Sequence, residues 1–136
     1  MHVNYLRRKG ATMPTDIRII HAQDFIRVTP EGHLDLEKSK ELLMEIASAS
    51  APLVDYGIIL DTRKAEIAMS VTELWLLAAE LSQFRKAFSG KTAVLCPLEK
   101  FDYAEFFALC AKNRGLQVRA FTSFEDAIEW LTANGA

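Results

Sequence analysis

The chain has 136 residues, of which 50% are hydrophobic and 25% charged, and this composition fits one globular domain that needs no disulfide or metal to fold. Its 16 basic residues do not outnumber its 18 acidic ones, so it lacks the positive excess with which proteins neutralise nucleic-acid phosphates. The longest apolar runs, such as Leu74 to Ala79, are far shorter than the ~20 residues of a membrane-spanning helix. We therefore expect neither nucleic-acid binding nor a transmembrane segment.

The N-terminal segment carries the basic cluster Arg7-Arg8-Lys9, with no apolar stretch behind it. A secretory signal requires such a stretch, so we expect a cytoplasmic protein. We predict that residues 1–14 are a flexible extension and that residues 15–134 form a single domain.

Two short runs of β-forming residues open the domain. They occupy residues 17–20 and 25–29, and the polar segment 21–24 between them predicts an antiparallel hairpin. Asp35 is placed to cap a first helix, because apolar residues recur at helical spacing from there to about Ser50.

A nearly continuous apolar run, Tyr56–Asp61, predicts a central strand that is covered on both faces. The sequence Ser70-Val71-Thr72-Glu73 has the pattern of a capping box, from which a second helix is predicted to run to about Phe88. Residues 91–96 form the next predicted strand, which Pro97 ends.

The last part of the chain repeats this alternation. A third helix is predicted from Asp102 to Arg114, with Gly115 suited to a left-handed C-terminal cap. A half-exposed strand follows at residues 116–121, and Ser123 begins a final helix. The order β-β-α-β-α-β-α-β-α predicts an α/β fold, in which a mixed, mainly parallel sheet with an N-terminal hairpin packs against four helices.

Two apparent site motifs fail on their spacing. Gly90-Lys91-Thr92 is similar to the end of a phosphate-binding loop, but Arg85 stands where that loop needs a glycine, and a strand follows instead of a helix. The three histidines His2, His21 and His33 have no partner at metal-ligand spacing. We therefore predict no metal site and no cofactor.

The two cysteines lie in apolar surroundings. This favours reduced core residues for both Cys96 and Cys110 over a disulfide. A catalytic pair of Cys96 with His33 is the alternative, but only Lys100 is near enough in the sequence to lower the pKa of the thiol, and core packing is favoured.

Asp61 and Arg63 leave the central strand where many α/β proteins gather binding groups, and Glu66 follows. The carboxylate and the guanidinium are candidate contacts for a polar ligand. The interpretation that we favour is that they pair with each other and close the loop.

These elements resemble the SpoIIAA-like branch of the STAS domains, which are bacterial relatives of the anti-sigma-factor antagonists. The resemblance covers about residues 16–132. It rests on residues 28–35 with Gly32, the strand end Ile58–Asp61, the helix start at Ser70, and the closing segments Val118–Phe121 and Glu125–Leu131. It implies a non-enzymatic regulatory or protein-interaction module that binds a protein partner or itself.

In antagonists of that family, a serine within an Asp-Ser-Ser-Gly-like stretch at the start of the second helix is phosphorylated, which switches binding off. The corresponding stretch here is Ala68-Met69-Ser70-Val71, which lacks the acidic residue, the second serine and the glycine. Only Ser70 could inherit the role, and a helix cap explains it fully. We therefore predict a module without the usual phosphoserine switch.

The second helix carries more apolar surface than one inward stripe requires. Trp75 and Leu76 fall on either side of the stripe that is formed by Leu74, Leu77, Leu81, Phe84 and Phe88. Both are candidate interface residues for a homodimer or a regulatory partner.

Two alternative functions stay open. SpoIIAA-like domains are topologically similar to Sec14-type lipid carriers, and the chain has 8 phenylalanines that could line a pocket for a small apolar ligand. The second alternative is an uncharacterised enzyme that uses Asp61, Arg63 or Cys96, although the sequence does not bring a base, a nucleophile and an orienting group together.

Overall fold

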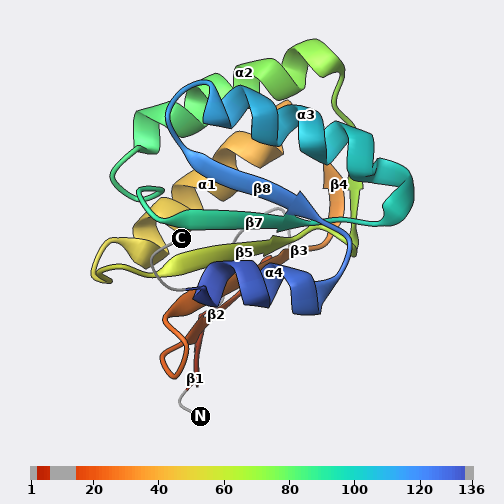
Figure 1. The fold of residues 1–136 in the computed structure, drawn as a ribbon. Helices are drawn as coiled ribbons and strands as arrows, with labels where there is room; N and C mark the ends of the chain where they lie inside the picture. Colours follow the sequence, from red (N-terminus) through yellow and green to blue (C-terminus); the bar gives the residue numbers. More distant parts are fainter. Residues whose placement is uncertain (1–2, 7–14, 134–136) are drawn as a thin grey trace.

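A computed structural model describes residues 3–6 and 15–133 of the chain. Its larger strands are β1 (Val3–Leu6), β2 (Thr15–Ile20), β3 (Phe25–Pro30), β5 (Gly57–Asp61), β7 (Lys91–Leu95) and β8 (Gln117–Phe121). Its α-helices are α1 (Leu36–Ser50), α2 (Val71–Leu81), α3 (Phe101–Lys112) and α4 (Phe124–Thr132). Helices α1, α2 and α3 cover one face of the sheet and α4 covers the other (Figure 1).

The strands form one sheet in the order β1-β2-β3-β5-β7-β8. The pairs β1–β2 and β2–β3 are antiparallel, and the pairs from β3 to β8 are parallel. Because each parallel connection passes through a helix, the strands β3, β5 and β7 end at the same edge of the sheet. The predicted α/β fold, with its N-terminal hairpin, mainly parallel sheet and four helices, is confirmed.

The structure adds three strands to the prediction. Strand β1 lies inside the predicted flexible extension and pairs with β2, with Val3 opposite Ile20, so the expected extension has secondary structure at this point. The rest of that extension, apart from residues 3–6, lies outside the described residues. A separate parallel pair joins β4 (Gly32–Leu34) to β6 (Ala65–Ile67). Three residues are too short to show a two-residue period, which is why the sequence did not reveal these strands.

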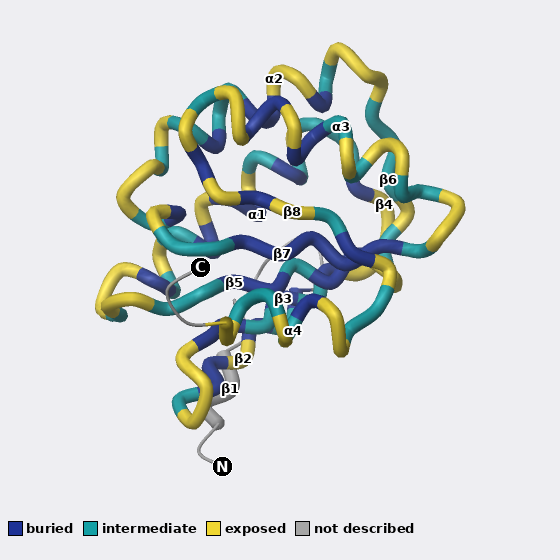
Figure 2. Tube along the Cα trace, in the orientation of Figure 1, coloured by how far each residue is buried: buried dark blue, intermediate teal, exposed yellow. Residues whose placement is uncertain are grey.

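Strand side chains alternate between two cores. Ile26, Val28 and Ile58 face the side of α1, α2 and α3, whereas Phe25 and Ile59 face the side of α4. The inner strands are the most deeply buried part of the chain (Figure 2). The near-continuous apolar runs of the sequence follow from this burial on both faces.

The helix starts agree with the prediction and two helix ends do not. Asp35 and Ser123 each accept a hydrogen bond from a backbone N–H of the first turn. Helix α2 ends at Leu81, not near Phe88, and continues as the short 3₁₀ helix η1 (Ser82–Phe84). The Ser82 hydroxyl donates to the Ala79 carbonyl oxygen at 2.6 Å, a local bond that competes with the helix.

Helix α3 also ends earlier than predicted, at Lys112. Gly115 has the expected left-handed backbone, with φ of +86°, and its N–H donates to the Lys112 carbonyl oxygen at 2.9 Å. The Leu116 N–H bonds back to the Ala111 carbonyl oxygen at 3.1 Å. Gly115 therefore turns the chain from α3 into β8.

We expect Gly115→Ala to lower the free energy of unfolding by about 1–2 kcal/mol, because a Cβ is unfavourable in the left-handed region. Gly115→Asn is the matched control, since asparagine has a Cβ but tolerates this conformation, and it should cost less. Urea unfolding measures both variants. A Cβ here would also lie 3.1 Å from Arg85 Nη1, so an equal loss in both variants would assign the effect to that contact instead.

Candidate functional site

An apolar cavity of about 70 Å³ lies between the sheet and helices α1, α2 and α3. Its wall includes Leu42 of α1, Leu60 of β5, Leu74 and Leu77 of α2, and Phe107 of α3. Holding one water molecule takes only about 10–15 Å³, but water enters a site only where polar partners are available. An empty apolar void of this size costs about 2 kcal/mol at ~24 cal/mol per Å³.

The cavity wall has few polar groups, and they differ in whether they find a hydrogen-bond partner. The Thr62 hydroxyl donates to the Leu95 carbonyl oxygen at 2.9 Å. Ser39 of α1 is 4% exposed, and its hydroxyl has no hydrogen-bond partner within the described part of the chain. Burying a hydroxyl without a partner is unfavourable by roughly 1–3 kcal/mol. Ser39 is therefore a polar group in the cavity wall that a ligand could satisfy.

Cys96 also lines the cavity, as a neutral thiol. Burial, and secondarily the nearby Glu99 carboxylate, raise its pKa to about 11. His33 lies 3.0 Å from the Glu66 carboxylate on the small β4–β6 sheet, and the structure does not pair it with Cys96. Cys96 and Cys110 are both buried and free, as predicted, and the Cys96 side chain forms part of the cavity wall.

The cavity has a mouth at the start of α3. Ile67, Met69, Lys100 and Tyr103 line both the cavity and a shallow recess of about 290 Å³, in which Ser70 also lies. The Lys100 ammonium lies 5.4 Å from the centre of the Tyr103 ring. Among the described residues, no carboxylate lies within ion-pair distance of this ammonium. The Glu73 carboxylate at Ser70 and the Glu99 carboxylate near Cys96 flank the same end of the cavity, so the ammonium is one of several charged groups there.

Ser70 sits at this recess as the N-cap of α2. Its hydroxyl accepts from the Glu73 N–H at 3.2 Å, and its own N–H donates to the Glu73 carboxylate at 3.0 Å. The predicted capping box is confirmed. The candidate role of Ser70 as a phosphorylation site remains a prediction.

Asp61 lies on the opposite face of the sheet from the cavity and is almost fully buried. Arg63 donates to both of its carboxylate oxygens at 3.0 Å through the side chain, and Arg27 of β3 donates at 3.1 Å. The Arg27 guanidinium also lies 4.9 Å from the centre of the Phe124 ring of α4. The predicted pairing of Asp61 with Arg63 is confirmed, and it joins β5 to β3 and α4.

Hydrogen bonding decides the ionisation of Asp61. Burial alone would raise its pKa, but the hydrogen bonds from the Arg63 side chain and backbone and from Arg27 outweigh that effect and lower it. Arg27 was not among the site residues predicted from the sequence. It lies opposite Ile59 in the β3–β5 register, two residues before Asp61, so both side chains project from the same face. Glu66 pairs with His33 and takes no part in this cluster.

The outer side of α2 presents apolar side chains to solvent. Val71, Trp75 and Leu76 are 53%, 49% and 41% exposed. The Arg114 guanidinium stacks over the Trp75 ring, 5.2 Å from its centre. Because Leu74 and Leu77 of the same helix line the cavity, α2 separates an inner apolar site from an outer apolar surface.

The described residues contain neither a metal-binding cluster nor a membrane-spanning helix. They contain no group of three or more side chains that could hold a metal ion. None of the helices in this part of the chain has the length and apolar character needed to cross a membrane.

Comparison with solved structures shows a SpoIIAA-like fold. An uncharacterised protein of the DUF3478 family from Shewanella loihica, described as having that fold, superposes with a TM-score of 0.54 at 14% identity, covering 95% of this chain and 93% of the other. An anti-sigma factor antagonist from Mycobacterium paratuberculosis superposes with a TM-score of 0.57 at 14% identity, covering 97% and 96%. No family model and no curated protein matches the sequence. The predicted SpoIIAA-like resemblance is confirmed as a likeness of fold.

We expect Asp61→Asn to lower the free energy of unfolding at pH 7 by about 2 kcal/mol, because hydrogen bonds to charged groups are lost. The folded-state pKa lies below the ordinary value of 3.8, so the ionised carboxylate stabilises the fold above that value. This contribution disappears as the pH falls below it, and the difference between the two proteins should narrow there. Urea unfolding between pH 7 and pH 3 measures the effect.

Asp16→Asn is the control for this prediction. Asp16 pairs with Arg18, whose side chain is 49% exposed, and such a surface pair contributes little. An Asp61→Asn loss that is the same at both ends of the pH range would show that packing, not charge, sets its effect.

Proposed function

We propose that the chain is a non-enzymatic regulatory module that binds a second copy of itself through the outer face of α2, without a phosphoserine switch. The observation that carries the proposal is the exposure of Val71, Trp75 and Leu76 along one helix. The fold supports the coarser part of the proposal, a role in protein binding, because one of the structures with the same architecture is described as an anti-sigma factor antagonist.

The chemistry of the helix fits a protein interface. Tryptophan is the most common anchor of binding energy, and Arg114 holds this one in place from one side. Singly scattered apolar side chains need no explanation, but three exposed ones fall within six residues of one helix, and Val71 and Trp75 are four residues apart on the same side of it. A two-fold contact between copies needs only one such self-complementary patch, so a second copy of the chain is the simplest partner for this surface.

The candidate catalytic groups support a role without catalysis. The pKa of the Cys96 thiol is raised to about 11, which keeps it protonated at neutral pH. Both oxygens of Asp61 accept hydrogen bonds from arginine side chains, so neither is available to act as a base. These groups lie on opposite faces of the sheet in the described residues, and their chemistry cannot be combined.

The capping box supports the absence of a phosphoserine switch. A phosphate on Ser70 would stand beside the Glu73 carboxylate, which is held 3.0 Å from the Ser70 nitrogen. The like charges would repel and would break the reciprocal cap. The capping box at the start of α2 therefore favours an unmodified Ser70 over a phosphorylated one.

We expect the wild-type chain to be a dimer, and the double variant Trp75→Ala, Leu76→Glu to be a folded monomer. The substitutions remove the aromatic anchor and put a charge in the interface, which should weaken self-association by at least about 100-fold. Light scattering coupled to size-exclusion chromatography over a concentration series measures the mass. Circular dichroism checks that the variant is folded.

Val54→Glu is the matched control for this experiment. Val54 is 77% exposed on the loop between α1 and β5, so the change removes an exposed apolar side chain away from α2. It should leave the dimer intact. A wild-type chain that stays monomeric at high concentration, or a dimer that the double variant does not weaken, contradicts self-association through this face.

The second candidate function is the binding of a small apolar ligand, and the observation that favours it is the cavity beneath α2. We expect the protein purified from its own host to carry an additional mass in native mass spectrometry. Ala104→Leu should remove that mass, because Ala104 lines the cavity and the larger side chain fills it. The same variant should unfold at a higher temperature, since it removes an empty void.

Ala111→Leu serves as the comparison. Ala111 is fully buried on α3 but does not line the cavity, so the larger side chain should be destabilising there. A wild-type protein with only its own mass, together with an Ala104→Leu variant no more stable than the wild type, would count against a ligand-binding cavity.

A further inference from the structure

Helices α2 and α3 together form the outer surface of the helical layer. They pack against each other on the same face of the sheet and begin at the same edge of it (Figure 1). The guanidinium of Arg114, which follows α3, lies over the Trp75 ring of α2. The exposed side of α2 therefore continues onto α3, where Leu109 is 55% exposed.

The end of this surface at which the helices begin is mainly acidic. Glu73 lies in the first turn of α2, and Asp102 and Glu105 lie in the first half of α3. Glu99 precedes α3, next to Lys100, which is the one basic residue of this group. Four carboxylates thus stand beside one ammonium at the helix starts.

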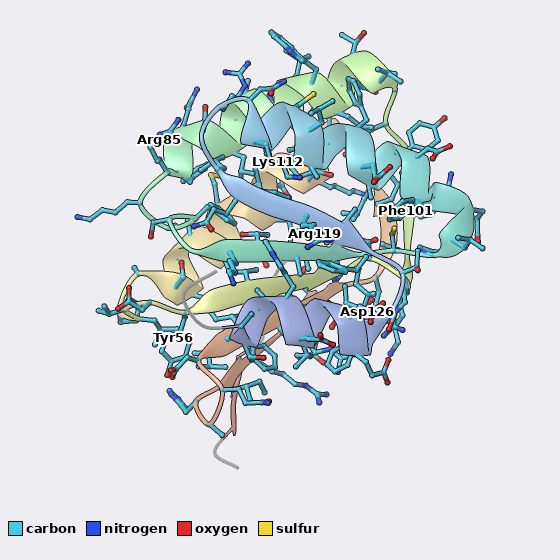
Figure 3. All side chains as sticks on the ribbon, viewed as in Figure 1. Tyr56, Arg85, Phe101, Lys112, Arg119 and Asp126 are labelled. Carbon is cyan, nitrogen blue, oxygen red and sulfur yellow. The ribbon has the colours of Figure 1, made fainter. Side chains whose placement is uncertain are left out.

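The opposite end of the surface is basic. Lys112 ends α3, and Figure 3 shows it at the far end of that helix from Phe101. The Arg85 guanidinium donates to the Arg114 carbonyl oxygen at 2.7 Å, which brings the segment after α2 to the same end. Lys86 follows Arg85, and Glu80 is the one carboxylate of the two helices in this region. The surface therefore carries opposite charge at its two ends.

Four exposed residues of α3 form one stripe along the helix. They are Asp102, Glu105, Leu109 and Lys112, at steps of three, four and three residues. None of the three charged ones has an ion-pair partner within the described part of the chain. The stripe is symmetric about position 107, because its outer and inner pairs of positions are each centred there. An antiparallel copy of α3 would therefore place each Asp102 opposite Lys112 of the other copy.

We propose that the second copy of the chain docks across α2 and α3 in antiparallel orientation, with Asp102 of each copy against Lys112 of the other. This inference rests on the proposed self-association through the outer face of α2, and it adds α3, the orientation and the charge pair. A two-fold axis that lies in the contact and crosses the helices gives this arrangement. An axis along the helices would put like charges together.

The size of the contact is the reason to include α3. One side of the 11 residues of α2 covers only about 170 Å², at about 1.5 Å rise per residue and about 10 Å width. Each partner of a stable complex buries about 800 Å². The contact must therefore extend onto a neighbouring element, and Arg114 already joins the exposed side of α2 to the end of α3. Complementary charges at the two ends then fix the orientation.

Exchange of the two charges tests the orientation on the full chain. Asp102→Lys and Lys112→Glu should each weaken self-association at least about tenfold, because each creates two like-charge contacts across the two-fold axis. The double variant Asp102→Lys, Lys112→Glu forms both pairs with their signs exchanged, so its dissociation constant should return to within about threefold of the wild-type value. Sedimentation velocity over a concentration series measures these constants.

The design separates contacts between copies from effects within one chain. Positions 102 and 112 lie about 15 Å apart along the helix, too far to pair within one copy. Both substitutions oppose the helix dipole, so recovery in the double variant cannot come from a more stable helix. The double variant also keeps the wild-type net charge of −2. Glu129→Lys, on an exposed position of α4, is the matched control and should leave the dissociation constant unchanged.

A mixture of the two single variants gives an independent check. One contact of the mixed dimer keeps the native pair and the other has the exchanged pair, so the mixture should form dimers although neither variant does so alone. Circular dichroism and thermal unfolding show that each variant is folded.

The outcomes separate this inference from the function on which it rests. Single variants that self-associate as the wild type does, or a double variant that does not recover, would overturn the antiparallel contact. If Trp75→Ala, Leu76→Glu still gives a monomer in that case, self-association through α2 stands. A wild-type chain that stays monomeric at high concentration would overturn both.

Discussion

The parallel pairing of β3, β5 and β7 is the constraint on which the other features of the molecule depend. Parallel strands must be joined by crossovers, so every helix that follows one of them begins at the same edge of the sheet. That geometry brings the starts of α1, α2 and α3 together, although Ser39, Ser70 and Lys100 are far apart in the sequence. The mouth of the cavity is a direct product of this arrangement.

The two faces of the sheet differ in how their side chains pack. On the α4 side, a buried carboxylate is satisfied by two arginines from different elements, and Asp61, Arg27 and Phe124 hold β5, β3 and α4 in register. On the other side, the same strands contribute only apolar side chains, and packing there leaves a void. A carboxylate whose two oxygens are both hydrogen-bonded stabilises the fold and is not free to bind a ligand, although the buried Arg27 Nε beside it has no partner within the described residues. The apolar cavity on the other face is where an apolar ligand could bind.

Much of the fold could be predicted because its signals are local. The Asp35, Ser70 and Ser123 caps and the left-handed Gly115 depend on a few neighbouring residues, and each was found where the sequence placed it. The end of α2 was misplaced because Phe84 and Phe88 continue the apolar spacing, although the chain tightens into the 3₁₀ helix η1 after Leu81. The contact of Arg27 with Asp61 and the grouping of Ser39 with Lys100 depend on strand order, which no local pattern encodes.

Helix α2 belongs to both proposed binding surfaces, and the question is whether they act on each other. Coupling between two sites requires an element with two arrangements whose balance each ligand shifts. Helix α2 is fixed at its start by the reciprocal bonds of Ser70 with Glu73 and at its end by Leu81, which is buried in the core. The two proposed surfaces use different side chains of this helix, because Leu74 and Leu77 line the cavity whereas Trp75 and Leu76 are exposed on the outer side. We therefore expect the two surfaces to bind independently.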